Sequence, residues 1–148
     1  GEVRLAEGKE IDFDKALWTI PAARMKAGKP HVVPLSPAAL RVFERARELK
    51  TFGQQHVFAG AKRGRPLSDM ALVKVMRDLG LEAVPHGFRS AFRDWVAEET
   101  DHPADLAEAA LAHTIKSKVE AAYRRGKLLA KRRVLMAEWA KYCGAGDG

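Results

Sequence analysis

The sequence contains almost no cysteine, and no part of it is hydrophobic for long. Cys143 is the single cysteine among 148 residues, which excludes a disulfide framework and a zinc site built from several cysteines. No apolar run approaches the roughly 20 residues that a membrane-spanning helix needs. Residues 1–4 are charged and precede no apolar segment, so we expect no secretory signal peptide and a protein of the cytoplasm.

Motifs for several common chemistries are also missing. The chain has no Walker-type phosphate loop, no G-x-G-x-x-G fingerprint and no G-x-S-x-G context around Ser90. His86, His102 and His113 lack the spacing of a zinc-binding H-E-x-x-H motif, so the sequence gives metal chemistry little support.

Positive charge is what the chain has in excess. It carries 26 Lys and Arg residues against 19 Asp and Glu, a formal net charge of +7, on a composition typical of one globular domain. Such an excess suits a polyanion such as nucleic acid, although a merely basic protein remains an alternative. Residues 121–137 contain six basic side chains and no acidic one: Arg124, Arg125, Lys127, Lys131, Arg132 and Arg133.

The hydrophobic pattern predicts an α+β fold that is mainly α-helical, with a small antiparallel β-sheet near the N-terminus. Residues 10–35 indicate a β-ribbon whose tip carries Lys26 and Lys29, with its last strand at a sheet edge because of Pro34. Ser36 is a predicted helix N-cap and Ser68 is a second. The helix that Ser68 begins should have an apolar face of Leu72, Val75, Met76 and Leu79 and should end at Gly80.

Three further helical segments follow in the sequence. One begins near His86, one is rich in alanine from residue 103 to 112, and the last spans residues 127–143. Their spacing predicts apolar stripes, and these consist of Phe88, Phe92, Trp95 and Val96 in the first, and Leu128, Leu135 and Trp139 in the last.

His86 and Arg89 are the first candidates for chemistry. Their spacing puts them on one face at the start of a helix, where an imidazole and a guanidinium can bind an oxyanion or a phosphate. An ordinary pair of surface side chains would have the same spacing.

Three other side chains have a functional and a structural interpretation. His113 follows an apolar run, where a lone histidine is most often a satisfied boundary residue. Tyr123 precedes Arg124 and Arg125, whose charge would ease formation of a phenolate, but tyrosine also packs well on an amphipathic helix. Lys26 could simply be a solvated hairpin lysine.

Taken in order, these residues resemble the catalytic domain of the tyrosine recombinases, the phage integrase family. Residues 86–95 resemble its His-x-x-Arg box, and residues 111–113 its Leu-Gly-His box, with Ala112 where many members have glycine. Residues 121–125 are similar to the nucleophile segment of prophage-type integrases, and residues 17–35 to the family's β-hairpin. The resemblance covers residues 1–143, implies the fold shared with type IB topoisomerases, and leaves residues 144–148 as an expected flexible tail.

The resemblance implies site-specific DNA recombination, as in prophage integration and excision, through a 3′-phosphotyrosyl intermediate. Tyr123 would attack the phosphodiester, while Arg89 and His86 bind its non-bridging oxygens. His113 would contact the phosphate or assist the leaving group, and Lys26 would protonate the leaving 5′-oxygen. The implied additional DNA contacts are Lys29, Arg93, Arg124, Arg125 and Lys127.

The resemblance also implies partners. They are a double-stranded DNA attachment site and, on DNA, three further copies in a homotetramer, with a monomer expected without DNA. We expect no metal, no cofactor and no membrane, and a location in the bacterial cytoplasm at the nucleoid. The last helix would either dock on a neighbouring protomer or pack on its own core.

One departure concerns the family's first arginine, which stands two residues before a Gly-Glu pair. Here Gly1 and Glu2 open the chain, and Glu2 matches the acidic residue that follows that arginine. We therefore expect a catalytic-domain fragment without the first arginine and the preceding DNA-binding domains, and with little or no cleavage activity. The alternatives are a type IB topoisomerase, a non-catalytic basic DNA-binding module, and a structural or protein-interaction domain.

Overall fold

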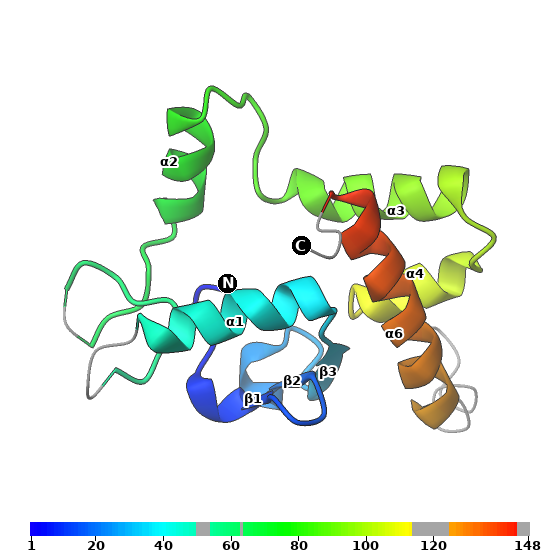
Figure 1. The fold of residues 1–148 in the computed structure, drawn as a ribbon, viewed down its shortest axis with the longest axis horizontal. Helices are drawn as coiled ribbons and strands as arrows, with labels where there is room; N and C mark the ends of the chain where they lie inside the picture. The colour runs from blue at the N-terminus through cyan, green and yellow to red at the C-terminus, as the bar shows by residue number, and fades with distance from the viewer. Residues whose placement is uncertain (50–53, 63, 114–124, 145–148) are drawn as a thin grey trace.

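A computed structural model describes residues 1–49, 54–62, 64–113 and 125–144, with the backbone alone at residues 125–127 (Figure 1). A short 3-10 helix η1 (Gly8–Glu10) leads into strands β1 (Ile11–Asp12), β2 (Leu17–Ile20) and β3 (His31–Pro34), with η2 (Ala22–Arg24) between the last two. The helices that follow are α1 (Pro37–Glu48), α2 (Ala71–Asp78), α3 (Gly87–Glu99), α4 (Ala104–Ala110) and α6 (Arg125–Tyr142). The prediction of a mainly helical α+β fold is confirmed.

The three strands form one antiparallel sheet in the order β1-β2-β3, as the sequence predicts. Trp18 of β2 pairs with Ile11 on one side and Val33 on the other. Pro34 lies at the end of β3, which is an edge strand among the described residues, so its missing N–H interrupts no central ladder.

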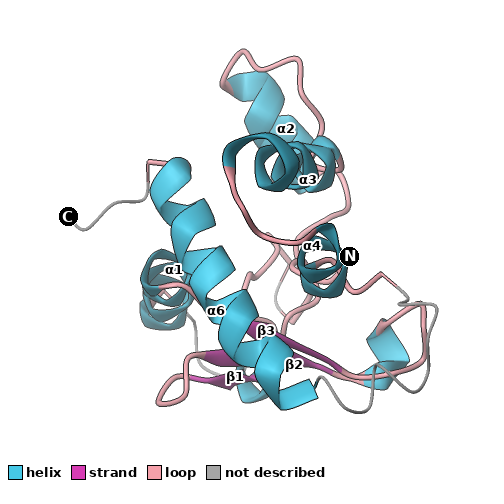
Figure 2. Cartoon of the chain, turned by 90° about the vertical axis from the view of Figure 1, so that its right-hand side faces the viewer, coloured by secondary structure: helices cyan, strands magenta, loops and turns pink. Residues whose placement is uncertain are grey.

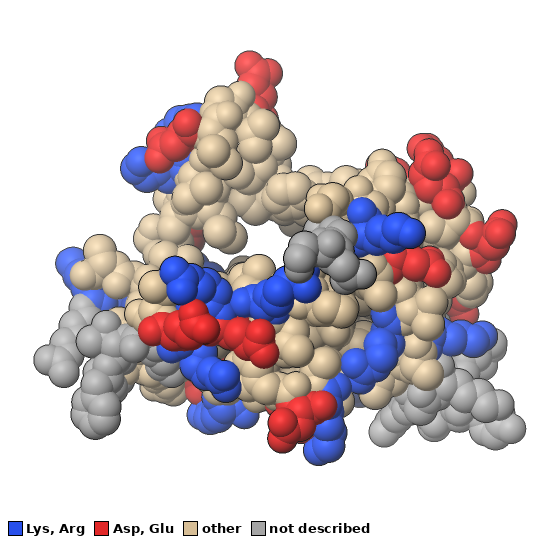
Figure 3. All heavy atoms as spheres, viewed as in Figure 1, with Lys and Arg blue, Asp and Glu red and all other residues tan. Residues whose placement is uncertain are grey.

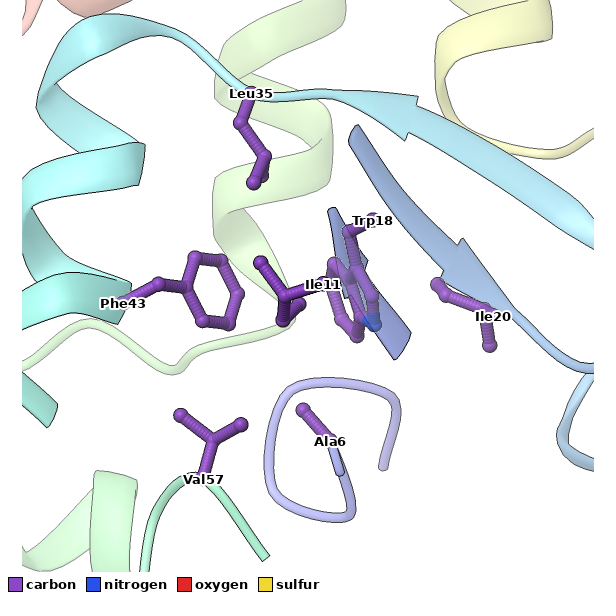
Figure 4. Close-up of a cluster of buried hydrophobic side chains, with 7 residues drawn as sticks. All are labelled: Ala6, Ile11, Trp18, Ile20, Leu35, Phe43 and Val57. Carbon is purple, nitrogen blue, oxygen red and sulfur yellow. The ribbon is translucent and has the colours of Figure 1, made fainter. Parts of the chain in front are cut away.

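The sheet and α1 enclose the first hydrophobic core. The predicted cap of α1 is confirmed, because the Ser36 hydroxyl accepts a hydrogen bond from the Ala39 N–H at 3.2 Å and Pro37 occupies the first helical position. Phe43 of α1 then meets Trp18 of β2 with their ring centroids 5.7 Å apart. The buried members of this cluster are Ala6, Ile11, Trp18, Ile20, Leu35, Phe43 and Val57 (Figure 4).

Glu10 is a buried carboxylate at the edge of this core. One of its oxygens accepts the Trp18 indole N–H at 3.0 Å and also binds the Arg24 guanidinium. Arg24 in turn donates to the Glu2 carbonyl at 3.0 Å. Because a buried carboxylate is stable only when paired, this network fixes η2, and with it the start of the loop that carries Lys26, against the N-terminal segment.

Helices α3, α4 and α6 enclose a second core. Its buried residues are Phe92, Trp95, Val96, Leu106, Ala107 and Leu135, and Leu128 and Trp139 pack against them as predicted. The prediction that Phe88 belongs to the buried apolar stripe of α3 is wrong, because Phe88, in the first turn of the helix, is 58% exposed. Leu135 is fully buried, so α6 packs on the core of its own chain, whereas docking on a neighbouring protomer remains a prediction.

Helix α2 departs most from its prediction. Met70 rather than Ser68 is its N-cap, and Met76 is its one buried residue, while Leu72, Val75 and Leu79 stay exposed. Gly80 ends the helix as predicted: its φ of +72° lets the Leu81 N–H reach back to the Met76 carbonyl at 2.9 Å. Figure 1 shows α2 at one end of the molecule, away from both cores.

Helix α6 joins the two cores, and it runs in front of the sheet in Figure 2. Arg132, at 9% exposure, donates to the Val32 carbonyl of β3 at 2.9 Å and to the Ala109 carbonyl of α4 at 3.5 Å. Burial lowers the pKa of Arg132, but the group stays charged in the physiological range. One member of the predicted basic run therefore faces the protein interior instead of solvent.

Among the described residues, none of the helices combines the length and the apolar character that crossing a membrane would require.

Replacing Arg132 with Met should destabilise the fold. The substitution removes the donor from two backbone carbonyls in a partly dry environment, so we expect the free energy of unfolding to fall by about 2–4 kcal/mol. Urea unfolding followed by circular dichroism measures this loss.

The neighbouring Arg133→Met is the matched control. Arg133 is exposed and donates to a single carbonyl, that of Lys15 at 3.0 Å, so its loss should be much smaller. Equal losses in the two variants would contradict the account of Arg132 as the link between the cores.

Candidate active site at the end of helix α4

Three side chains from three different elements converge on the C-terminal end of α4. The last carbonyls of a helix have no partner within the helix and carry the negative end of its dipole. Here the Ala109 carbonyl accepts from Arg132 of α6, the Ala110 carbonyl from His31 Nε2 of β3 at 3.2 Å, and the Leu111 carbonyl from Arg89 of α3. This helix end therefore fixes the relative positions of α3, α6 and the sheet edge.

A tight turn after α4 carries the chain from this end to His113. Ala112 has a φ of +58°, in the left-handed region that favours glycine. The turn is closed by the His113 N–H, which donates to the Glu108 carbonyl at 2.9 Å. As a result the His113 ring lies directly beside Arg89.

The Arg89 guanidinium is the centre of the site. Its Nη2 donates to the Leu111 carbonyl and lies 3.2 Å from His113 Nε2, and its Nη1 lies 4.0 Å from the Glu2 carboxylate. The side chain is 36% exposed, so it is only partly buried by the contacts that hold it. An arginine held in this way keeps N–H groups available for a bidentate contact to a phosphate.

Glu108 binds His113 from the other side. Its Oε2 pairs with His113 Nδ1, and its Oε1 lies 2.8 Å from Nε of Arg93, one turn after Arg89 on α3. The hydrogen bond from His113 is the main reason why the pKa of Glu108 lies below its ordinary value; burial opposes this shift, and the charge of Arg93 adds to it.

The described part of the site carries a small positive excess. Arg89 and Arg93 are offset by Glu2 and Glu108, and the buried Arg132 at the same helix end is left over. In the face shown in Figure 3, Lys and Arg side chains lie along α6 with acidic atoms among them toward its C-terminal end, and acidic and basic side chains alternate over α1. Within the described residues no group of three or more His, Cys, Asp or Glu side chains is arranged to hold a metal ion.

The structure brings together Arg89, Arg93 and His113 of the predicted residues. His86 is the N-cap of α3, three positions before Arg89 as predicted, but its ring is exposed and no described hydrogen bond joins it to the site. Lys26 and Lys29 are exposed on the loop between η2 and β3, also without a described bond to Arg89 or His113.

The remaining predicted residues have no described side chain. Tyr123 and Arg124 lie outside the described residues, and Arg125 and Lys127 lie in the first turn of α6, where the backbone alone is described. Their roles stay predictions.

Comparison with known proteins decides the family. The family model described as "Phage integrase family" matches residues 1–127. The chain belongs to the phage integrase family. It is 38% identical over 99% of its length to Prophage integrase IntA of Escherichia coli K12, and 33% identical over 95% to the Integrase of Shigella phage Sf6.

The chain spans a little over a third of the length of these phage integrase relatives, 36% and 37% respectively. No solved structure gives a significant match.

Two of the residues at the end of α4, Arg89 and His113, could be predicted from the motifs of the phage integrase family. Arg93 could be expected near Arg89, because it follows by four residues and so shares the same face of α3. Nothing in the sequence indicates a place for Glu108 in the site. His31 and Arg132 carry no signal, since their carbonyl partners are distant in sequence.

Replacing Ala112 with Gly should stabilise the protein. A side chain in the left-handed region costs about 1–2 kcal/mol, part of which the greater entropy of unfolded glycine offsets, so we expect a net gain of about 0.5–1 kcal/mol. The control is Ala97→Gly on the exposed face of α3, which should lose about 1 kcal/mol. Urea unfolding measures both, and a loss in Ala112→Gly would show that the turn does not need this conformation.

His31 should make stability depend on pH. Burial, followed by the nearby charge of Arg132, lowers the pKa of His31 below its ordinary 6.5. The unfolded chain then binds the proton more readily, so this contribution is complete above about pH 6.5 and is lost as the pH falls through the lower pKa of the folded state.

We expect the wild type to lose stability in urea unfolding between pH 7.5 and pH 5, and His31→Gln to lose less over the same range. His86→Gln changes an exposed histidine and should follow the wild type. Identical pH dependence in the wild type and His31→Gln would refute the assignment.

Proposed function

We propose that this chain is the catalytic part of a site-specific DNA recombinase that cuts and rejoins DNA strands through Tyr123. The observation that carries the proposal is the pairing of Arg89 with His113 at the end of α4, in a chain of the phage integrase family. The relatives named prophage or phage integrases support recombination as the reaction class. The roles of the single residues rest on their resemblance to the motifs of this family.

The reaction would be a transfer of a phosphodiester from one oxygen to another. The Tyr123 Oη forms a bond to phosphorus, the bond from phosphorus to the 5′-oxygen breaks, and the tyrosine proton leaves as the 5′-oxygen gains one. The 3′-phosphotyrosyl link conserves the bond energy, so a 5′-hydroxyl from another strand can reverse the step without ATP. No metal or cofactor enters this scheme.

Arg89 and His113 would stabilise the charge that develops on the non-bridging oxygens. Fixed donors in a preorganised site act without reorganising at the moment of reaction, and they usually contribute more to such catalysis than any other single effect. Arg89 is preorganised because the Leu111 carbonyl and His113 already hold its Nη2.

Other predicted residues would complete the site when DNA is bound. His86, at the N-cap of α3, would join the phosphate contacts, and Lys26, on the exposed loop after η2, would protonate the leaving 5′-oxygen. The basic residues that would bind the DNA backbone are Lys29, Arg93, Arg124, Arg125 and Lys127. On an attachment site the whole protein would assemble as a homotetramer.

Tyr123→Phe should separate catalysis from binding. In a longer chain, of the length of the phage integrase relatives, we expect the wild type to form a covalent protein–DNA adduct on a nicked suicide duplex. Removing the phenolic hydroxyl should abolish the adduct, which denaturing gels detect, and change the affinity for the duplex by less than about threefold.

Tyr142→Phe is the matched control. Tyr142 lies at the end of α6, where its ring stacks on Trp139, and this substitution should leave adduct formation unchanged. Binding without an adduct in the wild type would favour a non-catalytic DNA-binding module. An adduct that relaxes supercoils but never exchanges strands would favour a topoisomerase.

A further inference from the structure

We propose that Glu108 is a positioning residue for His113: it holds Nδ1 of the ring so that Nε2 faces Arg89, and it allows Nε2 to take up a proton when a phosphate binds there. This inference rests on the proposed function, because the phosphate concerned is the one that Arg89 would hold. Neither the sequence pattern nor the family resemblance assigns Glu108 a role.

The first support is geometric. Glu108 and His113 are joined twice, by the Glu108 Oε2 contact to His113 Nδ1 and by the backbone bond from the His113 N–H to the Glu108 carbonyl. The second oxygen of Glu108 is bound by Arg93 at 2.8 Å, so the carboxylate cannot turn freely. The ring is thus fixed to α4 on one side and, through Arg93, to α3 on the other.

The second support is that the contacts of His113 with Glu108 and with Arg89 require the same tautomer of its ring. A carboxylate only accepts hydrogen bonds and a guanidinium only donates them. Nδ1 must therefore carry the proton that Glu108 accepts, and Nε2 must offer its lone pair to Arg89 Nη2 at 3.2 Å. The lowered pKa of Glu108 supports an ionised carboxylate at neutral pH.

Binding of a phosphate beside Arg89 would change which protonation state of His113 Nε2 is favourable. A non-bridging oxygen beside Arg89 would point its lone pairs at the lone pair of Nε2, and that repulsion ends if Nε2 gains a proton and donates it. Glu108 at Nδ1 and Glu2 beside Arg89 favour the resulting imidazolium, whereas Arg89, Arg93 and, from α6, Arg132 oppose it. The carboxylate of Glu108 is the closest of these charges and bonds directly to the ring.

The same geometry gives Arg93 a second role. It lies on the same helix as Arg89 and binds the carboxylate that orients His113, so α3 supplies both the phosphate-binding arginine and the group that fixes its neighbour. Contact between Arg93 and DNA remains a separate prediction.

The primary test does not need catalysis. Nitrogen NMR of the 148-residue chain reports which nitrogen of His113 carries the proton. We expect Nδ1 to be protonated in the wild type and the preference to be lost in Glu108→Ala. Glu108→Gln keeps an acceptor for Nδ1 without the charge and should keep the tautomer. Glu98→Ala, an exposed change on α3, is the control.

Inorganic phosphate added to the same chain tests the proton uptake. At pH 7 we expect phosphate to shift His113 in the wild type toward the doubly protonated ring, and to do so less in Glu108→Gln because the compensating charge is missing. An unchanged tautomer in Glu108→Ala, or equal protonation in the wild type and Glu108→Gln, would overturn the inference.

Cleavage in the longer chain separates this inference from the proposed function. In metal centres, removing a carboxylate that orients a histidine lowers metal affinity or activity by about 10–100-fold. We expect a fall of the same size in the rate of adduct formation for Glu108→Ala. For Glu108→Gln we expect a smaller fall that deepens as the pH rises, with substrate binding unchanged in both. If the NMR spectra show the expected tautomers but the wild type forms no covalent adduct, the proposed function is wrong and the positioning role of Glu108 still holds.

Discussion

The site depends on how this fold satisfies the C-terminal end of α4. A seven-residue helix has as many unpartnered carbonyls at its end as a long one, and leaving them dry would cost free energy comparable to lost hydrogen bonds. Arg132, His31 and Arg89 meet that need from α6, β3 and α3. The two hydrophobic cores share no buried residue, and the contacts at the end of α4 fix their relative position.

The functional geometry follows from that arrangement. Because the Leu111 carbonyl already holds Arg89, the guanidinium has a fixed orientation before any ligand arrives, and the turn at Ala112 delivers His113 to its side. Glu108 and Arg93 then set the orientation of the ring. The phosphate site of the proposed recombinase is thus an extension of a helix terminus whose partners also stabilise the fold.

Most local features of this structure can be predicted from the sequence, because they depend on near neighbours, although the cap predicted at Ser68 is wrong. The cap at Ser36, the helix end at Gly80 and the edge position of Pro34 each follow from the chemistry of one residue. The same holds for the His-x-x-Arg spacing at the start of α3.

Features that depend on distant partners could not be predicted. Phe88 has the helical spacing of a core residue, yet none of the described elements covers its position. Arg132 belongs to a basic run, but it is buried because the carbonyls of Val32 and Ala109, 100 and 23 residues away, need a donor. For Glu108, five residues before His113, the helix geometry alone does not determine that the ring folds back onto it.

The central claim is that Arg89 and His113 hold one DNA phosphate. A crystal structure of the longer chain bound to a nicked suicide duplex tests it most directly, through the distances from that phosphate to the Arg89 nitrogens and to His113 Nε2. We expect both to lie within hydrogen-bond distance of the scissile phosphate, with Glu108 still at Nδ1. A scissile phosphate held elsewhere, with Arg89 and His113 still bound to each other, would contradict it.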